Sequence, residues 1–463
     1  MYLSTFLFQE IQELKTALTE ERDRSAVIWD QLQAYGKNCT ENEECRVEED
    51  KEQSEKFIDG DHPIIPRMKS TGMFEYDKGE ERKLLKVLIT DLKPSVAAEF
   101  LPGLPAYVLF MLIRYLDHIN DSNRIRDLIE GGISHIKKTV RKLGQTDIEL
   151  KALWLSNTVK LLHCLKQYSG EPRFQLENTS KQKEQCLHNF DLSAYWKALS
   201  DIACWIYHGI TEVIAEQLQP SMVIALLEHE GIKGLGGDKL RPQIQGRVGS
   251  KDTYPDPKLA LDCLLIQLTS YHDIFQKQGV ENEIICQIFR QIFYFLCAGC
   301  LNNLLLRKDL CHWSRGMQIR YNVAQLEQWA KDQGLEDAGY RVSDALSPII
   351  QAAHLLQAKK SQENVNEICS MCSNLRVSQI LKILNLYTPG DEFEDRVTPV
   401  FVGKIQESLK ERAMVEDKDG ISLLLDTKYI FYFRFHFKPS YIDFTELEAE
   451  DLYSNLPNML KKI

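Results

Sequence analysis

Apolar residues recur every three or four positions along most of the chain from about residue 74, which is the spacing of amphipathic helices. The first stripe consists of Leu84, Leu85, Leu88 and Leu92, and Pro105 opens the next helix, where its missing N–H costs nothing. Further helices are predicted at 125–143, 150–165, 259–278, 282–306, 323–331, 343–358, 377–386 and 398–412. This succession predicts an all-α fold.

One predicted helix is much longer than the others. Asp191 has the residue type of an N-cap, and the helical pattern after it continues toward Leu227, with a kink expected at Pro220. At 1.5 Å per residue this helix is roughly 55 Å long. Such a rod is too long for one compact bundle, so we expect it to join two.

The segment Cys297–Asn322 combines apolar character with fixed charge. Its helical pattern starts apolar on every side, which predicts burial, and then reaches Arg307, Lys308 and Asp309. Charged side chains are not buried without a partner. We therefore predict one buried helix that ends in exposed charge and anchors a docking surface.

Four stretches depart from this pattern. Residues 1–35 keep a broken helical spacing, which we interpret as a residual coiled-coil or stalk helix. Residues 36–73 are predicted to be an acidic disordered linker, because most of them are polar and cannot offset the entropy of ordering. Residues 229–258 are rich in Gly, Pro and charge, which predicts a surface loop. Alternating aromatic residues in Tyr429–Lys438 predict an extended segment that lies along a groove.

Net charge narrows the classes of partner. The 463-residue chain carries a formal net charge of −11, with a pI near 5.6. Nucleic acids and anionic lipid surfaces both require a basic face, so we expect no nucleic-acid partner and only indirect membrane association. Most of the 12 cysteines lie in apolar runs, which is typical of reduced core thiols in the cytosol.

Neither a signal peptide nor a membrane span is expected. The N-terminal MYLSTFLF carries no basic residue, and an acidic stretch follows it at once. The most apolar helix, 284–306, is interrupted by Gln287, Arg290, Gln291 and Asn302. Its longest uncharged run is about 16 residues, whereas a spanning helix needs about 20. We interpret it as a buried helix of a soluble fold.

Two Cys-x-x-Cys pairs raise the question of a metal site. Cys297/Cys300 and Cys369/Cys372 could together supply four thiolates. Zinc pairs normally sit on tight turns about 15–20 residues apart, whereas these pairs are about 70 apart and lie in helices. Core packing is the favoured interpretation, and we expect no metal and no cofactor.

Other signatures of catalysis are weak. The Gly-rich stretch GIKGLGGDK ends in lysine but is not a phosphate loop, and no strand precedes it. His163 beside Cys164 and His312 beside Cys311 do not form thiol–imidazole pairs, because adjacent helical side chains point about 100° apart. The sequence therefore predicts a protein that is not an enzyme.

Three polar positions remain as candidate sites. Lys308 follows an apolar run and cannot be buried unpaired, and Lys382 sits on the polar side of SQILKILNLYTP. The alternative for either lysine is a solvated charge at a helix end. Ser250 lies near Arg247 and Lys251 and is a candidate phosphosite, although an unmodified loop serine is the default interpretation.

Four long phrases resemble the globular cargo-binding tail, or dilute domain, of class V unconventional myosins. They are LPGLPAYVLFMLIRYLDHIND (101–121), WLSNTVKLLHCLKQYSGE (154–171), NLLLRKDLCHWSRGMQIRYNVAQLEQW (303–329) and ICSMCSNLRVSQILKILNLYTP (368–389). The resemblance covers about 75–460 and is greatest to the Vc branch. Residues before 70 resemble only the end of the tail stalk.

The resemblance implies an elongated pair of helical-bundle subdomains bridged by a long helix, with an extended C-terminal segment wrapping back. The implied division is a stalk helix (1–35), a linker (36–73), subdomain 1 with the bridging helix (74–228), a loop (229–258), subdomain 2 (259–425) and a C-terminal extension on subdomain 1 (426–463). The motor ATPase and the calmodulin-binding IQ motifs of the family are absent from this chain.

The implied work is recognition. Tails of this family recruit the motor to vesicles or secretory granules on actin through Rab GTPases and adaptors, and they dock back on their own motor to hold it inactive. The implied location is the cytoplasm, and an upstream coiled coil would make a homodimer. A rival is the dilute-domain scaffold of a Ras/Rap-effector adhesion protein. Such a scaffold should carry Ras-association, forkhead-associated or PDZ modules, and the sequence shows none of them.

The resemblance also assigns residues. The two lysines that dock the tail on the motor correspond to Lys308 in LLLRKD and Lys382 in QILKILN. A Rab-binding patch corresponds to Tyr321 in QIRYN and Gln357 in LLQAKK. A close relative has an Arg-rich serine cluster in its regulatory loop, and only RVGSK around Ser250 remains here.

Overall fold

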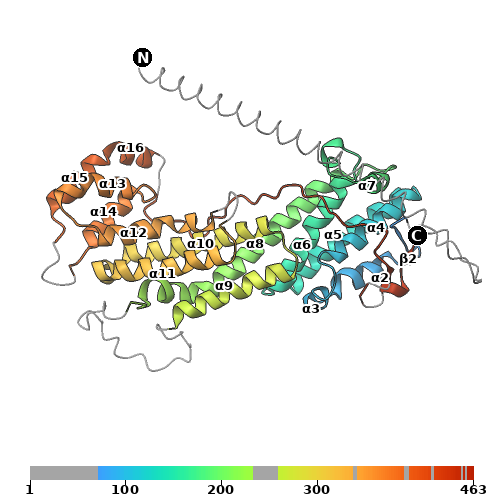
Figure 1. Ribbon diagram of the computed structural model, residues 1–463, viewed down its shortest axis with the longest axis horizontal. Helices are drawn as coiled ribbons and strands as arrows, with labels where there is room; N and C mark the ends of the chain where they lie inside the picture. Colours follow the sequence, from blue (N-terminus) through green and yellow to red (C-terminus); the bar gives the residue numbers. More distant parts are fainter. Residues whose placement is uncertain are drawn as a thin grey trace, which may run out of the picture. The chain divides into compact units, whose positions relative to one another are not determined.

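The computed structural model describes most of the chain after residue 70. The described residues are 71–232, 259–336, 341–389, 396–418, 422–449, 452–453 and 456–463. Lys69–Ile463 forms one compact unit (Figure 1). The predicted stalk helix 1–35, the linker up to residue 70, most of the loop 229–258 and Ser250 lie outside the described residues.

Most of the described part is helical and its only strands are two of two residues each, which confirms the predicted all-α class. Its first elements are β1 (Phe74–Glu75), α2 (Glu81–Leu85), η1 (Lys86–Thr90), α3 (Pro94–Ala97), α4 (Leu104–His118), α5 (Ser122–Lys142), α6 (Ile148–Gln167), η2 (Pro172–Phe174), α7 (Ser180–Glu184), α8 (Ala194–Val223) and η3 (Ile224–Glu228). The later elements are α9 (Ala260–Lys277), α10 (Asn282–Leu306), η4 (Lys308–Leu310), α11 (Trp313–Asp332), η5 (Val342–Leu346), α12 (Ser347–Gln357), η6 (Gln362–Asn364), α13 (Val365–Met371), α14 (Val377–Leu386), α15 (Pro399–Ser408), α16 (Lys410–Lys418), η8 (Leu456–Asn458) and β2 (Lys461–Lys462).

Helix α4 shows how the local sequence sets a buried element. Pro105 lies in its first turn, as predicted, and nearly every side chain of the helix is buried. Gly103 precedes the helix with φ of 92°, and a Cβ there would lie 2.2 Å from Cδ of Lys160. Only glycine combines this backbone conformation with so close an approach from α6.

The long helix α8 joins the two halves of the unit. Together with the π-helical turn η3 it forms 35 residues of helix, or about 52 Å. It packs against α6 and also against α10, so it bridges helices from both halves (Figure 1). The predicted N-cap was wrong: the cap position is Ser193, and the Asp191 carboxylate instead accepts the Ser193 N–H at 2.8 Å in a turn before the helix.

The helix continues through Pro220 toward Leu227, as predicted, and the kink expected at Pro220 stays a prediction. Pro220 lies inside α8, and the hydrogen-bond pattern changes to π only at Ile224, where η3 begins. The division of the chain into subdomains at 74–228 and 259–425 stays a prediction.

Within Cys297–Asn322 the predicted buried helix ends just before the charged residues, and a second helix follows within the same segment. Helix α10 ends at Leu306, Arg307 is extended (φ −116°, ψ 104°), and α11 begins at Trp313. The ring of His312 caps α11 by accepting the Arg315 N–H at 3.2 Å. The predicted start of this helix at residue 323 was ten residues too late, because the charged and aromatic residues of its first turns hide the apolar spacing.

Two described helices are long and apolar enough to pass a length-and-composition test for a membrane span. They are the continuous helix Ala194–Glu228 and α10. In α10 the most apolar window is 89% buried inside the fold, so its apolar side chains form the core, as predicted.

The C-terminal segment, residues 422–463, is held by amide side chains of several helices. It starts beside α14, follows α10 and reaches α6 (Figure 1). The prediction of an extended segment at 429–438 is confirmed, since no helix forms there. The backbone contacts are made by Gln379 to Leu423, Asn302 to Leu425, Gln291 to Tyr429 and Phe431, Gln287 to Arg434, and Gln167 to Ser440.

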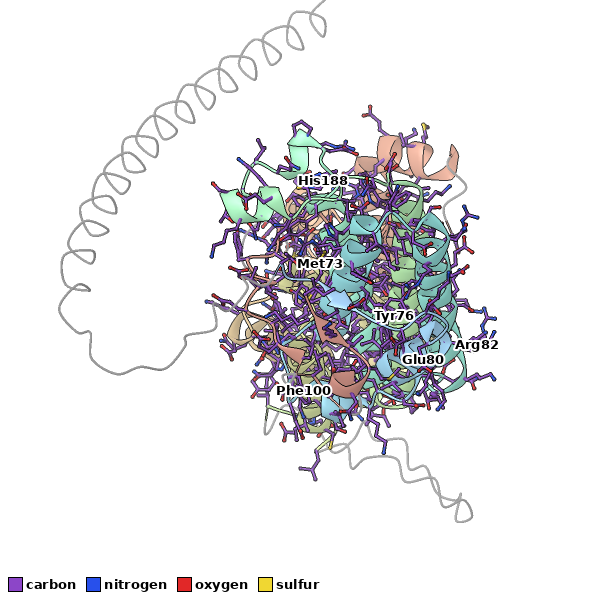
Figure 2. The ribbon with its side chains drawn as sticks, turned by 90° about the vertical axis from the view of Figure 1, so that its right-hand side faces the viewer. Met73, Tyr76, Glu80, Arg82, Phe100 and His188 are labelled. Carbon is purple, nitrogen blue, oxygen red and sulfur yellow. The ribbon has the colours of Figure 1, made fainter. Side chains whose placement is uncertain are left out.

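The chain closes on itself at the end of this segment. Strand β2 pairs antiparallel with β1, with Phe74 opposite Lys462. Met73 and Tyr76, which flank β1, are buried among the helices at this end (Figure 2). The Arg124 guanidinium lies 4.3 Å from the centroid of the Tyr76 ring, which fixes the entry of the chain against α5.

Candidate docking surfaces

The first candidate surface, which we call the lysine surface, contains Lys308, Lys382, Leu306 and Trp313. Lys308 opens the short helix η4 and is exposed. The charges on either side of it are already paired, because Arg307 binds Asp309 at 2.7 Å and also binds Glu228. The Arg307 guanidinium lowers the pKa of the Asp309 carboxyl below its usual value.

Lys382 comes from a different element but meets the same turn. It lies half-buried on α14, and the end of α14 is tied to the turn by the Thr388 N–H, which donates to the Cys311 carbonyl at 2.8 Å. Burial raises the pKa of the Cys311 thiol to about 12, while the nearby charge of Lys382 opposes that rise. The fold thus brings both predicted lysines to the neighbourhood of Cys311.

Two features suit this surface to a reversible protein contact. Within the described part of the chain, neither Lys308 nor Lys382 forms an ion pair. Leu306 and Trp313 are 67% and 37% exposed, so apolar area lies on both sides of Lys308 in the sequence. Solvated cations beside exposed apolar groups can bind an acidic partner surface in a salt-sensitive manner.

The second candidate surface, which we call the Tyr321 surface, lies where α11 meets residues 229–232. The amide of Gln318 bonds both the N–H and the carbonyl of Ile232, at 3.0 and 2.8 Å. Asn322 donates to the carbonyls of Leu226 and His229. The Tyr321 side chain is 40% exposed, and a Cβ on Gly231 would lie 2.4 Å from its ring. The ring therefore rests on the backbone at Gly231.

Gln357, the other predicted residue of this patch, has a different environment. Its Nε2 donates to the carbonyls of Gly316 and Ala353, both at 3.1 Å, where α11 and α12 cross. The helices approach so closely that a Cβ on Gly316 would lie 2.9 Å from the Ala353 carbonyl oxygen. The amide of Gln357 is thus engaged inside the fold.

Tyr321 lies on one side of α11, and Gln357 of α12 contacts another side of α11. Gly316 and Arg320 face α12, where Arg320 adds to the effect of burial in lowering the pKa of His354. Gln318 and Tyr321 face residues 231–232 instead. The structure therefore does not bring Tyr321 and Gln357 into one contact.

Three cysteines of the two pairs, Cys297, Cys300 and Cys372, are buried, and Cys369 is half-buried. Burial raises the pKa values of Cys297 and Cys372 to about 12, which disfavours the thiolate form that binds zinc. Among the residues that the structure describes, no group of three or more His, Cys, Asp or Glu side chains is placed to hold a metal ion.

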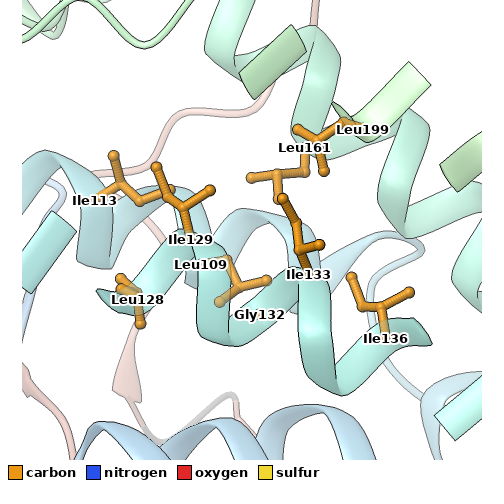
Figure 3. A pocket seen from close by; sticks show the side chains of 9 residues that line it. All are labelled: Leu109, Ile113, Leu128, Ile129, Gly132, Ile133, Ile136, Leu161 and Leu199. Atoms are coloured by element: carbon orange, nitrogen blue, oxygen red, sulfur yellow. The ribbon is translucent and has the colours of Figure 1, made fainter. Parts of the chain in front are cut away.

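An apolar cavity lies between α4, α5, α6 and α8 (Figure 3). Leu109, Gly132 and Leu199 are among its lining residues, and its volume is about 10 Å³. This volume holds no more than about one water molecule, so the cavity is a packing void in the core.

The residues that hold the C-terminal segment were not predicted from the sequence. Gln287, Gln291 and Asn302 were noted only as interruptions of an apolar helix, although each binds the backbone of this segment. A signal was present, because amides in a buried helix require partners.

Comparison with known proteins identifies the class of fold. The family model of the DIL domain matches residues 287–391, which contain Lys308, Tyr321, Gln357 and Lys382. A solved structure of the Myo2 globular tail with Mmr1 has a TM-score of 0.58 at 20% identity and covers 76% of this chain and 85% of that one. The solved structure of the cargo-binding domain of yeast myosin 5 has a TM-score of 0.56 at 19% identity and covers 80% of this chain and 93% of that one. These neighbours define the fold as that of a DIL-containing globular tail.

Relatives in sequence name the family. Human unconventional myosin-Va is 48% identical over 391 residues, which are 82% of this chain and 20% of that protein. Human myosin-Vb is 41% identical over 436 residues, which are 94% of this chain and 23% of that protein. Human myosin-Vc is 41% identical over 375 residues, which are 80% of this chain and 21% of that protein. The chain belongs to the class V myosins, and its fold is that of their globular tail.

The chain is much shorter than these relatives, and its identity differs between them. The chain spans about a fifth of the length of these relatives. The identity to myosin-Va exceeds that to myosin-Vc, so the expected preference for the Vc branch is not supported.

Proposed function

We propose that this chain recruits a class V motor to vesicles or secretory granules through Rab GTPases and adaptors, and that it also docks on its own motor to restrain it. Membership of the class V myosin family carries the proposal. The Myo2 globular tail has been solved in complexes with Mmr1, Smy1 and Inp2, which supports adaptors as partners. The location is then the cytoplasmic face of the cargo, and dimers form through a coiled coil upstream of the globular tail.

The lysine surface is the proposed motor dock. Its support is the combination of two cations without an ion-pair partner in the described residues and the exposed side chains of Leu306 and Trp313. Lysine is a strongly hydrated point charge, so its contact with an acidic motor loop forms and breaks readily and weakens with salt. Such a contact suits a restraint that cargo must release.

The Tyr321 surface is the proposed centre of Rab recognition. Tyrosine combines apolar area with a hydroxyl and is a frequent anchor at interfaces. Its exposed ring lies against the backbone at Gly231. In this proposal Gln357 acts by holding α12 against α11, and Tyr321 makes the contact with the GTPase.

One experiment tests both parts of the proposal. The affinity of the chain for the isolated motor domain is measured at low salt, with and without a saturating GTP-loaded Rab protein that binds the chain. If cargo and motor favour different states of the tail, each weakens the other by the same factor, typically about 5–150-fold.

Two results would contradict the proposal. Equal affinity for GTP-loaded and GDP-loaded Rab proteins would rule out a nucleotide-read cargo site. Motor affinity that is unchanged by saturating Rab would rule out coupling between cargo and restraint.

A further inference from the structure

The part of the C-terminal segment beside α10 carries positive charge in an acidic protein. Residues 428–438 contain Lys428, Arg434, His436 and Lys438 and no acidic residue, whereas the whole chain has a net charge of −11. His436 contacts Glu283 at 2.8 Å. Within the described residues Lys428 and Arg434 form no ion pair, and Arg434 lies 5.2 Å from the centroid of the Tyr432 ring.

This part of the chain is extended and runs antiparallel to α10. Leu425 is bound to Asn302, and Arg434 is bound to Gln287. The fifteen helical residues between these two amides span about 22 Å, and nine residues of the segment cover the same distance. The rise of about 2.5 Å per residue is nearer to that of a strand than to that of a helix.

Its side chains alternate between the core and solvent. Phe433 is buried and stacks on Tyr207, with ring centroids 4.3 Å apart. Phe431 and Phe435 are half-buried, whereas the Tyr432 side chain between them is 80% exposed. The segment is therefore anchored on one face and presents the other to solvent.

Several of its backbone groups have no hydrogen-bond partner among the residues that the structure describes. Within residues 428–438, amide side chains of α10 bind the backbone of Tyr429, Phe431 and Arg434. For the backbone groups of Tyr432 and Phe435 no hydrogen bond to a described residue is found. An extended backbone with open N–H and C=O groups is a template for adding a strand.

We propose that residues 429–437 receive an extended acidic peptide from a partner protein. The peptide pairs with the open backbone groups, places carboxylates against Lys428 and Arg434, and packs an apolar side chain on Tyr432. The acidic character follows from charge complementarity with a basic segment that lacks carboxylates of its own. This surface is separate from the lysine surface and the Tyr321 surface, so the proposed function can fail while this inference stands.

The probe is a fluorescent peptide of about ten residues that alternates glutamate with valine, a length that matches a typical strand. The control peptide has the same sequence with alternate backbone nitrogens methylated, which keeps charge and side chains but removes donors. Anisotropy is measured for the whole chain and for Y432A, R434E and the matched control Y441A, whose tyrosine is 75% exposed outside the basic segment.

We expect the parent peptide to bind in a salt-dependent manner and the methylated peptide to bind at least about tenfold more weakly. The substitutions Y432A and R434E should each weaken binding by about fivefold or more, and Y441A should not. Hydrogen exchange should slow at the amides of residues 430–437 when the parent peptide binds.

Three results would overturn the inference. The first is absence of binding by the parent peptide. The second is equal binding by the methylated peptide, which would mean charge attraction without strand pairing. The third is binding of vesicles of phosphatidylserine and phosphatidylcholine that R434E abolishes while peptide binding is unaffected, since this would make the segment a lipid contact.

Discussion

The lysine surface and the Tyr321 surface lie within one stretch of helices but are built in different ways. In the first, Lys308 lies in η4, Lys382 of α14 lies near Cys311 in the following turn, and neither lysine forms an ion pair with a described residue. In the second, Tyr321 is exposed, while the amide of Gln357 donates a hydrogen bond to the Gly316 carbonyl where α11 and α12 cross.

The difference teaches which residue types mark a surface. A lysine that follows an apolar run must reach solvent or a partner, because burying its charge alone is too costly. A glutamine satisfies its amide equally well on backbone groups inside the fold, as Gln357 and Gln287 do. Fixed charge is therefore the better guide to a docking surface, and an amide is the weaker one.

The largest expected effect is on binding of the motor. The double variant K308E/K382E should lower affinity for the isolated motor domain at low salt by about a hundredfold, because two attractive contacts become repulsive. The matched control is K137E/K138E, which makes the same change of charge at two exposed positions of α5. If both double variants lose affinity equally, net charge rather than the lysine surface is responsible.

The next effect concerns the helix crossing behind Gln357. The substitution G316A places a methyl group 2.8 Å from Cβ of Leu356 and 2.9 Å from the Ala353 carbonyl oxygen. Overpacking of this kind should lower the free energy of unfolding by about 1–3 kcal/mol, measured by chemical denaturation. The control is G403A, since a Cβ at Gly403 meets nothing within 4 Å. Its free energy of unfolding should change only by the small amount expected for glycine to alanine in a helix.

A smaller effect distinguishes the roles of Tyr321 and Gln357. The substitution Q357A removes two hydrogen bonds within the fold and should destabilise the protein by about 1 kcal/mol. The exposed side chain in Y321A should change stability by less than about 0.5 kcal/mol but weaken binding of GTP-loaded Rab. If Q357A weakens Rab binding more than Y321A does while stability is unchanged, the assignment of contact and positioning is reversed.

The smallest expected effect is on the pH dependence of stability, through Asp309, the residue after Lys308. Arg307 lowers the pKa of Asp309, so the ionised carboxylate stabilises the fold above the usual pKa of about 4 and loses this contribution as the pH falls through its folded value. The substitution D309N should therefore flatten the loss of stability below about pH 4. Unfolding curves of the variant and the original protein that remain parallel between neutral pH and pH 3 would contradict this role.

The bounds of a helix could be predicted where its apolar residues followed one clear helical spacing. The bounds of α10 match the prediction because apolar residues fill every side of it and stop at Arg307. The start of α11 was missed because Trp313, Arg315 and Arg320 break the apolar spacing. Asp191 was misassigned because a carboxylate that caps a turn and one that caps a helix look the same in a sequence.

The C-terminal segment shows what pattern alone cannot supply. Its alternating aromatics correctly predicted an extended chain, but its path depends on amides far away in the sequence, such as Gln167 and Gln287. Likewise, only the fold shows that Lys382 lies near Cys311, in the turn that follows Lys308, and that Gln357 bonds Gly316 while Tyr321 lies against Gly231. Contacts between distant elements are set by tertiary packing, which local periodicity does not encode.

Hydrogen exchange of the chain with and without the isolated motor domain locates the dock without any substitution. If the lysine surface is the dock, amides of residues 307–313 and of α14 exchange more slowly in the complex, while those around Tyr321 and Gly231 do not change. Protection confined to other elements, with residues 307–313 unaffected, would show that this tail does not hold its motor through Lys308 and Lys382.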